Sequence, residues 1–200
     1  GFNLVNIGEQ LHRGIEIDSL FFLSEDLVVT FAGSYIDANY EDHKNGPCDR
    51  TFVPPASDDC PIVNGGPARV KDFTGRTPSG VPEIAITVSA TYSFDINPNI
   101  SGYVTGEYVY EDEFQATDAV PIEVPNALRE VGTFNASVGV KHEPSGFGLM
   151  VWGRNINDDE YIYTGFNVPG SPGSYAGYPV VPSMWGITIN KEFWLVYPNW

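Results

Sequence analysis

Long segments in which apolar and polar residues alternate strictly limit what this chain can fold into. The clearest segment lies between Glu83 and Asp95. One set of positions is apolar and the other is small and polar: Ile84, Ile86, Val88, Ala90, Tyr92 and Phe94 against Ala85, Thr87, Ser89, Thr91, Ser93 and Asp95. Because successive side chains of a strand point to opposite faces, this segment predicts a strand with one apolar face and one polar face.

The same alternation recurs along the chain, so we expect an all-β, antiparallel fold. Glycine, proline and aromatic residues are plentiful, and long helix-forming blocks are missing, which favours strands joined by turns. The pattern predicts seven strands, at about residues 4–23, 27–41, 83–95, 100–114, 130–143, 147–163 and 182–193.

The charged residues and the strand lengths indicate the surroundings of these strands. Charged residues within the strands fall on the polar set, and the exceptions lie near strand ends: Arg13, Asp37, His142 and Lys191. A charge on a lipid-facing position costs most near the bilayer midplane and little near the interfaces. Most of the predicted strands are also longer than the five or six residues that are usual in globular proteins. A soluble β-sandwich alternates as well, but these lengths favour a transmembrane β-barrel.

The connections alternate between short and long. Residues 24–26, 96–99 and 144–146 form tight turns, whereas residues 42–82, 115–129 and 164–181 form long loops. Short turns at one rim and long loops at the other are typical of outer-membrane barrels. Complete bacterial barrels have an even number of strands, so an odd count predicts a fragment that begins partway round the barrel. We expect the missing strands to close it.

Four stretches resemble the C-terminal barrel region of TonB-dependent outer-membrane receptors, in the order and spacing of that family. They are VNIGEQLHRGIEID (Val5 to Asp18), DFTGRTPSGVPEIAITVSATY (Asp72 to Tyr92), WGRNINDDEY (Trp152 to Tyr161) and VPSMWGITINKEF (Val181 to Phe193). The last stretch resembles the closing strand that the barrel assembly machinery reads, and its signal residues are Trp185, Gly186 and Phe193. Ser183 stands where the family usually has arginine, and Lys191 interrupts the apolar row.

The resemblance implies a transporter of the cell outer membrane of a Gram-negative bacterium, and not an enzyme. Residues 1–193 would be the C-terminal part of a 22-stranded barrel, and residues 194–200 a short extension. Such receptors actively import scarce nutrients such as ferric siderophores, cobalamin, haem or carbohydrates. The implied partners are outer-membrane lipid, the N-terminal strands and plug of the same protein, the TonB complex through that plug, and the nutrient. No cofactor is implied.

The candidate ligand-binding residues lie in the long loops, because loops carry recognition on a rigid scaffold. Arg69, Lys71 and Arg76 would meet an anionic ferric chelate through charge-assisted bonds, or would form ion pairs within their loop. The aromatic candidates Phe166, Tyr175 and Tyr178 would stack on a sugar or a chelate, or would pack on neighbouring loops.

Two further features of the sequence concern disulfide and metal chemistry. Cys48 and Cys60 share one loop, so we expect a local disulfide; free thiols or a metal site with His43 are the alternatives. The three histidines lack metal-ligand spacing, and we expect no metal centre. The acidic clusters 111–113 and 158–160 fit a solvated rim better than a calcium site.

Composition and motifs exclude some classes and leave two rivals. A formal net charge of −16 with no basic cluster argues against nucleic acid as a partner, and no catalytic or nucleotide-binding motif occurs. The rivals are another outer-membrane barrel, passive and porin-like or adhesive, and a soluble carbohydrate-binding β-sandwich.

Overall fold

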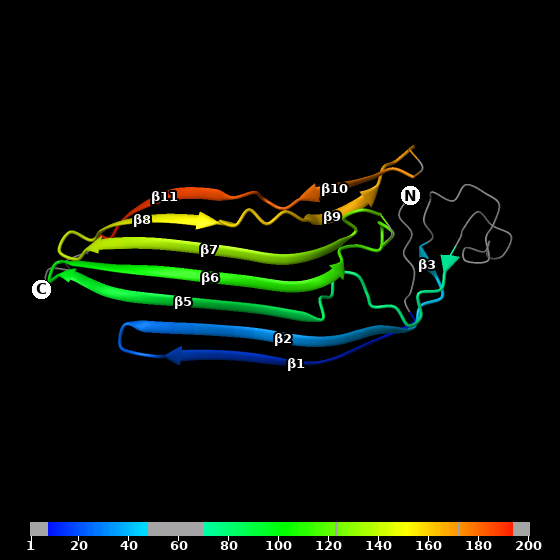
Figure 1. Ribbon diagram of the computed structural model, residues 1–200, viewed down its shortest axis with the longest axis horizontal. Coiled ribbons are helices and arrows are strands. Elements are labelled where there is room, and N and C mark those ends of the chain that lie inside the picture. Colours follow the sequence, from blue (N-terminus) through cyan, green and yellow to red (C-terminus); the bar gives the residue numbers. More distant parts are fainter. Residues whose placement is uncertain (1–7, 48–69, 123, 172, 194–200) are drawn as a thin grey trace, which may run out of the picture.

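The computed structural model describes residues 8–47, 70–122, 124–171 and 173–193 as a single large antiparallel sheet with small hairpins at one end (Figure 1). The seven strands of this sheet are adjacent in the order in which they follow one another along the chain. They are β1 (Glu9–Phe22), β2 (Leu27–Asp42), β5 (Ile84–Asn97), β6 (Ile100–Gln115), β7 (Leu128–His142), β8 (Phe147–Arg154) and β11 (Met184–Lys191). The all-β expectation and the seven-stranded antiparallel sheet are confirmed. No helix among the described residues is long and apolar enough to cross a membrane.

Short turns lie at one end of the sheet and long connections at the other (Figure 1). The connections β1–β2, β5–β6 and β7–β8 are short turns. The long connections hold two further two-stranded sheets, β3 (Gly46–Pro47) with β4 (Val70–Lys71), and β9 (Ile162–Asn167) with β10 (Tyr175–Pro179). We call the end with the long connections the loop end.

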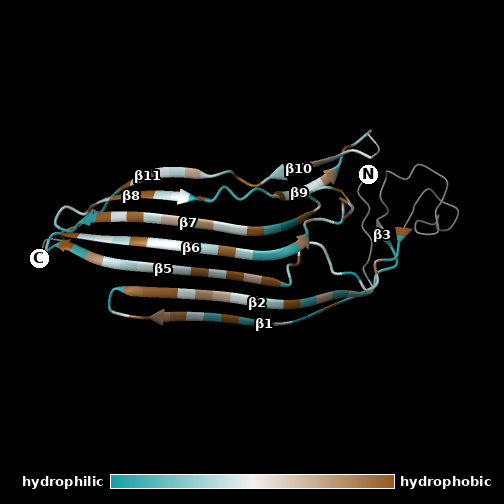
Figure 2. Cartoon of the chain, in the orientation of Figure 1, coloured by the Kyte–Doolittle hydropathy of each residue, from teal (hydrophilic) through white to brown (hydrophobic). Residues whose placement is uncertain are grey.

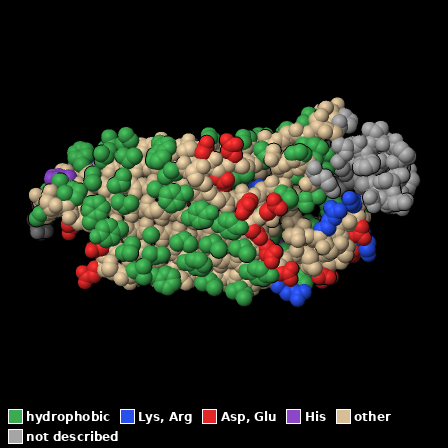
Figure 3. Space-filling model, viewed as in Figure 1, with side chains coloured by type: hydrophobic (Ala, Val, Ile, Leu, Met, Phe, Trp, Pro, Cys, Tyr) green, Lys and Arg blue, Asp and Glu red, His purple; other side chains and the backbone are tan. Residues whose placement is uncertain are grey.

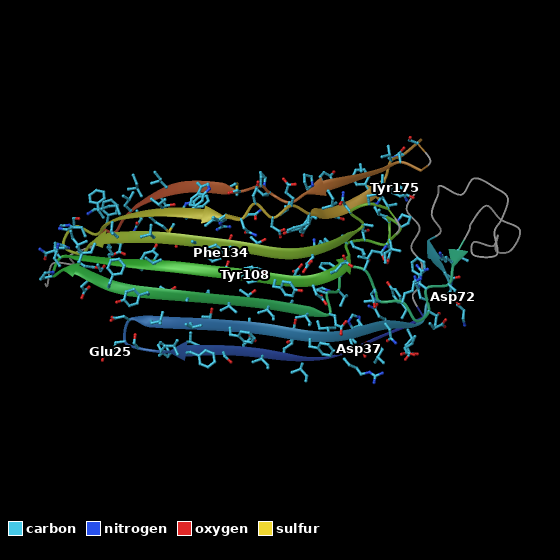
Figure 4. All side chains as sticks on the ribbon, in the orientation of Figure 1. Glu25, Asp37, Asp72, Tyr108, Phe134 and Tyr175 are labelled. Carbon is cyan, nitrogen blue, oxygen red and sulfur yellow. The ribbon has the colours of Figure 1, made fainter. Side chains whose placement is uncertain are left out.

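The register brings the predicted apolar sets of all seven strands onto one face. In one cross-strand row Phe31 lies opposite Val88, Val88 opposite Tyr108, and Tyr108 opposite Phe134. Figure 2 shows the alternation along each strand, and Figure 4 shows Tyr108 and Phe134 on neighbouring strands. We call this the apolar face. It carries no charged side chain between its end rows, where Arg13 lies opposite Asp37 and Lys191 lies opposite Phe147.

No second layer of the described residues covers the apolar face (Figure 3). Ile187 and Ile189 on β11 are 69% and 72% exposed, and even Val138 on the inner strand β7 is 45% exposed. Ile86 and Val88 are only half-buried. The described residues therefore do not form two sheets packed face to face, which is the arrangement a β-sandwich requires.

The opposite face, which we call the polar face, is held by short hydrogen bonds between neighbouring strands. The Thr30 and Ser89 hydroxyls are 2.6 Å apart, and those of Thr91 and Thr105 are 2.9 Å apart. Asn135 donates through Nδ2 to Glu107 at 2.8 Å. A hollow of about 230 Å³ on this face is lined partly by Glu16, Asp18, Thr87 and Glu111.

The short turns are not level along the strands: in Figure 1 the β1–β2 turn stops short of the β5–β6 and β7–β8 turns. By register, the midpoint of the β1–β2 hairpin at residue 25 projects onto residue 94 of β5, whereas the midpoint of the β5–β6 hairpin is residue 98. The β7–β8 turn lies about half a residue further along. The total step is about 4.5 residues over four inter-strand spacings. At about 3.3 Å per residue and about 4.8 Å per spacing, the strands are inclined by about 40° to the perpendicular of the line that joins the turns.

The predicted strand 147–163 is wrong in its second half. β8 ends at Arg154, and Asn155 and Asp158 adopt left-handed backbone conformations with φ of 49° and 53°. Asparagine and aspartate tolerate this region better than other non-glycine residues, so the chain turns here and pairs again only in β9. The β3–β4 pair lies within the predicted loop 42–82, and the β9–β10 hairpin begins at Ile162 and continues through the predicted loop 164–181.

Burial is concentrated at the loop end. The buried hydrophobic residues lie on the loop-end parts of β2, β6 and β7 or in the adjoining loops: Ala38, Tyr40, Phe73, Phe114, Val120, Ala127 and Val131. The middle of the sheet has no comparable core among the described residues. The packed part of the chain therefore surrounds the place where the strands enter their long connections.

Candidate functional site

An aromatic cluster joins the end of β2 to the segment after β4. The rings of Tyr40 and His43 are 4.6 Å apart, and those of His43 and Phe73 are 5.4 Å apart. The guanidinium of Arg76 lies over the Phe73 ring at 4.8 Å. Backbone bonds from Tyr40 N to Arg76 O and from Gly75 N to Tyr40 O fix the segment against β2. His43 is buried and its Nδ1 has no hydrogen-bond partner among the described residues.

The carboxylate of Asp72 stabilises the turn that carries Phe73. It accepts the Thr74 N–H at 2.9 Å, and the Thr74 hydroxyl accepts the His43 N–H at 3.1 Å. Hydrogen bonds from the side chain and then the backbone of Thr74 lower the pKa of Asp72 below its ordinary value. Asp72, labelled in Figure 4, therefore stays ionised at neutral pH.

Arg129 connects β6, β7 and β9. It forms an ion pair with Glu111 at 3.2 Å and donates to the backbone carbonyl of Tyr163 at 2.9 Å. Its guanidinium also lies 4.5 Å from the centroid of the Phe114 ring and 5.6 Å from that of Tyr161. Burial raises the pKa of Tyr161. Arg129 thus ties the β9–β10 hairpin to the main sheet.

Replacing Arg129 with lysine should destabilise the loop end by about 1–2 kcal/mol. A lysine ammonium keeps the positive charge. It lacks the planar guanidinium, which contacts Glu111, the Tyr163 carbonyl and the aromatic rings at the same time. The midpoint of urea unfolding of the full-length protein measures the loss. Arg154→Lys is the matched control, since Arg154 lies over Trp152 at 5.8 Å and has no ion pair among the described residues. Equal midpoints for the two variants would contradict the role of Arg129.

In the turn after β8, side chains form the hydrogen bonds to β7 that a continued β8 strand would have formed. Asn155 is buried, and its amide donates to Asp159 O at 2.9 Å and Val181 O at 3.1 Å while accepting from Asp159 N at 2.8 Å. The Phe134 N–H donates to Asn157 Oδ1 at 2.8 Å, and the Gly132 N–H donates to Asp159 Oδ2 at 2.7 Å. These bonds satisfy the part of β7 that β8 no longer reaches.

A cavity of about 500 Å³ lies at the loop end. Its walls come from β2, the segment between β4 and β5, the ends of β6 and β7, the loop 116–127 and the end of β9. The charged residues that line it are Lys71, Arg76, Glu83, Asp112, Glu113 and Asp118. We call this the loop-end cavity. Its volume falls within the range of small-molecule binding sites.

The structure brings two of the six predicted ligand residues into this cavity. Lys71 and Arg76 line it, and neither forms an ion pair with a described carboxylate. Phe166 and Tyr178 form a separate pair of rings 5.7 Å apart on the β9–β10 hairpin, and Tyr175 lines a second cavity of about 210 Å³. Arg69, Cys48 and Cys60 lie outside the described residues. Within the described ranges, no group of three or more acidic, histidine or cysteine side chains is arranged to hold a metal ion.

The last predicted strand, 182–193, is present as β11, which is two residues shorter at each end than expected. Trp185 is exposed on the apolar face. Gly186 lies opposite Trp152, and a Cβ at Gly186 would collide with that ring. Phe193 lies beyond the strand and is 82% exposed. Lys191, which interrupts the apolar row, donates to Ser145 O and lies 4.5 Å from the Phe147 ring centroid.

Sequence reasoning missed Tyr40, Glu113, Asp118 and Arg129 as site residues. In the sequence, Tyr40 does not differ from the other aromatic residues of the predicted strands. In the structure its hydroxyl donates to Asp118 at 3.4 Å. Arg129 falls in the predicted loop 115–129, next to the apolar pattern of β7. A cation beside an apolar strand is a weak signal, because it becomes informative only when its partners on other elements are known.

The chain matches no protein-family model, and no curated protein matches it.

Proposed function

We propose that this chain forms part of the wall and outer loops of an outer-membrane β-barrel, and that the complete protein is a TonB-dependent receptor that imports a scarce nutrient. The observation that carries the proposal is the uncovered apolar face. Seven strands present apolar side chains, exposed or half-exposed, with charges confined to the end rows. A soluble monomer rarely exposes an apolar patch of more than a few hundred Å², whereas hydrocarbon solvates such a face.

The dimensions of the apolar face support the same proposal. On β5 the apolar row runs from Ile84 to Phe94, ten residue steps or about 33 Å along the strand. At the inclination of about 40° derived from the turns, the row spans about 25 Å along the membrane normal. Outer-membrane barrels have strand tilts of about 35–45° and an apolar band about 25 Å tall.

The ends of the sheet support an orientation. The acidic side chains seen in Figure 3 gather where the strands pass into the long connections. Asp37, Glu83 and Asp112 belong to this loop-end border. In the proposed orientation the loop end faces the outside of the cell, and the short turns face the periplasm.

The two outer edges of the sheet, on β1 and β11, have no neighbouring strand among the described residues. Unpaired backbone groups cost several kcal/mol each in hydrocarbon. We therefore propose that further strands of a longer protein pair with both edges. The assignment to TonB-dependent receptors within outer-membrane barrels is supported by the four sequence stretches named above, and it makes the chain a transporter component and not an enzyme.

Spin labels at adjacent positions test the proposal. We expect a label at Val138→Cys, on the apolar face, to be accessible to dissolved oxygen and shielded from a water-soluble nickel chelate. We expect the reverse at Ser137→Cys, on the polar face of the same strand. The measurement is power-saturation electron paramagnetic resonance on the full-length protein in lipid vesicles. Equal access of the nickel chelate to both labels would overturn the membrane assignment.

A further inference from the structure

The loop-end cavity has an excess of negative charge. Among the described residues that line it, four contribute carboxylates, Glu83, Asp112, Glu113 and Asp118, and two contribute cations, Lys71 and Arg76. The whole chain also carries a formal net charge of −16. An anion entering the cavity would meet an unfavourable potential, because carboxylates close to a ligand repel it and the surrounding charge adds to that repulsion.

Several polar groups in the cavity have unused hydrogen-bonding capacity. Among the described residues Glu113 has no partner, and Asp118 accepts only from the Tyr40 hydroxyl. Gln115 donates through Nε2 to the carbonyls of Thr117 at 3.1 Å and Val120 at 2.8 Å, which leaves its side-chain oxygen as an acceptor. Lys71 is half-buried and has no partner within the described ranges. The cavity thus offers mostly acceptors, with a few donors among them.

Apolar surfaces complete the lining. Val81, Pro121 and Ile122 contribute side chains to the cavity, and Ile122 is 50% exposed. The faces of Phe73 and Phe114 are already partly covered by Arg76 and Arg129, at 4.8 Å and 4.5 Å. Aliphatic C–H surface is therefore more available to a ligand than open aromatic faces.

We propose that this cavity binds a neutral, hydroxyl-rich ligand of the oligosaccharide class and not an anionic iron chelate. Each sugar hydroxyl can donate and accept a hydrogen bond. One neutral ligand can therefore donate to Glu113 and Asp118 and accept from Lys71 without adding charge. The C–H faces of the sugar rings match the aliphatic lining. This inference rests on the proposed function, because it takes the loop end as the face that meets nutrients.

The test uses the full-length protein in detergent on an array of neutral oligosaccharides printed beside their uronic-acid counterparts, with a ferric tris-catecholate measured separately by fluorescence quenching. We expect retention of at least one neutral oligosaccharide and weaker binding of its uronic-acid form. Asp118→Asn and Glu113→Gln should each weaken that retention by about tenfold, since each removes a hydrogen bond to a charged acceptor. Glu160→Gln, an exposed glutamate outside the cavity, is the matched control and should leave retention unchanged.

Three results would overturn the inference: no retention of any neutral oligosaccharide, tighter binding of the uronic acids or the ferric chelate, or retention that both cavity variants leave unchanged. Failure here is distinguishable from failure of the proposed function. The spin labels at Ser137 and Val138 report on the membrane independently of what the cavity binds.

Discussion

Replacing Val88 with lysine should destabilise the membrane-inserted protein by about 2–4 kcal/mol, the cost of a lysine at a lipid-facing position near the bilayer midplane. Val88 lies in the middle of the apolar row of β5, between Phe31 and Tyr108 of the neighbouring strands. No described carboxylate lies on the apolar face beside it, so the ammonium would have no partner.

Thr87→Lys is the matched control because it changes the next residue on the same strand. Thr87 points to the polar face and lines the hollow that also contains Glu16, Asp18 and Glu111. A lysine there stays in water and meets opposite charge, so we expect a change within about 0.5 kcal/mol. Urea titration of folding into lipid vesicles, followed by tryptophan fluorescence, gives both values. A Thr87→Lys cost equal to that of Val88→Lys would show that the two faces have the same surroundings.

Replacing Asn155 with alanine should cost about 3 kcal/mol or more and should loosen the whole segment between β8 and β9. The side chain makes three hydrogen bonds from a buried position, and their loss leaves Asp159 N–H and two carbonyls without partners. The left-handed backbone at φ 49° adds roughly 1 kcal/mol for alanine.

Asn155→Gly separates the two causes. Glycine accepts the left-handed conformation but also lacks the hydrogen bonds, so we expect it to be destabilised by roughly 1 kcal/mol less than Asn155→Ala. Amide hydrogen exchange at Asp159 and Gly132, together with the urea midpoint, reports both effects. Unchanged protection at Asp159 in the alanine variant would mean that Asn155 does not hold the turn.

The strands of the sheet and their faces were predictable from local sequence. The long strands β1, β2, β5, β6 and β7 each show a period of two over much of their length, and a strand with this pattern has only one way to present a single apolar face. The end of β8 was not predictable in this way. Beyond Arg154, the carboxamide of Asn157 and the carboxylate of Asp159 satisfy β7 through contacts that depend on the neighbouring strand.

The candidate site was predictable only in part. A cation-bearing loop suggested Lys71 and Arg76, and both line the loop-end cavity. Its four carboxylates come from segments separated by up to 35 residues, from Glu83 to Asp118. Their convergence depends on how the loop 116–127 folds back on the ends of β2 and β6, so no local pattern reports the excess of negative charge.

The sequence by itself determined which side chains share a face, where the short turns lie and which connections are long, because strand periodicity and turn chemistry act between neighbouring residues. The tertiary structure alone decided how far each turn steps past the last, which gives the strand inclination, and which distant side chains meet around Arg129 and Asp118. Those features depend on inter-strand register and loop packing, whose free energies are sums over residues far apart in the chain.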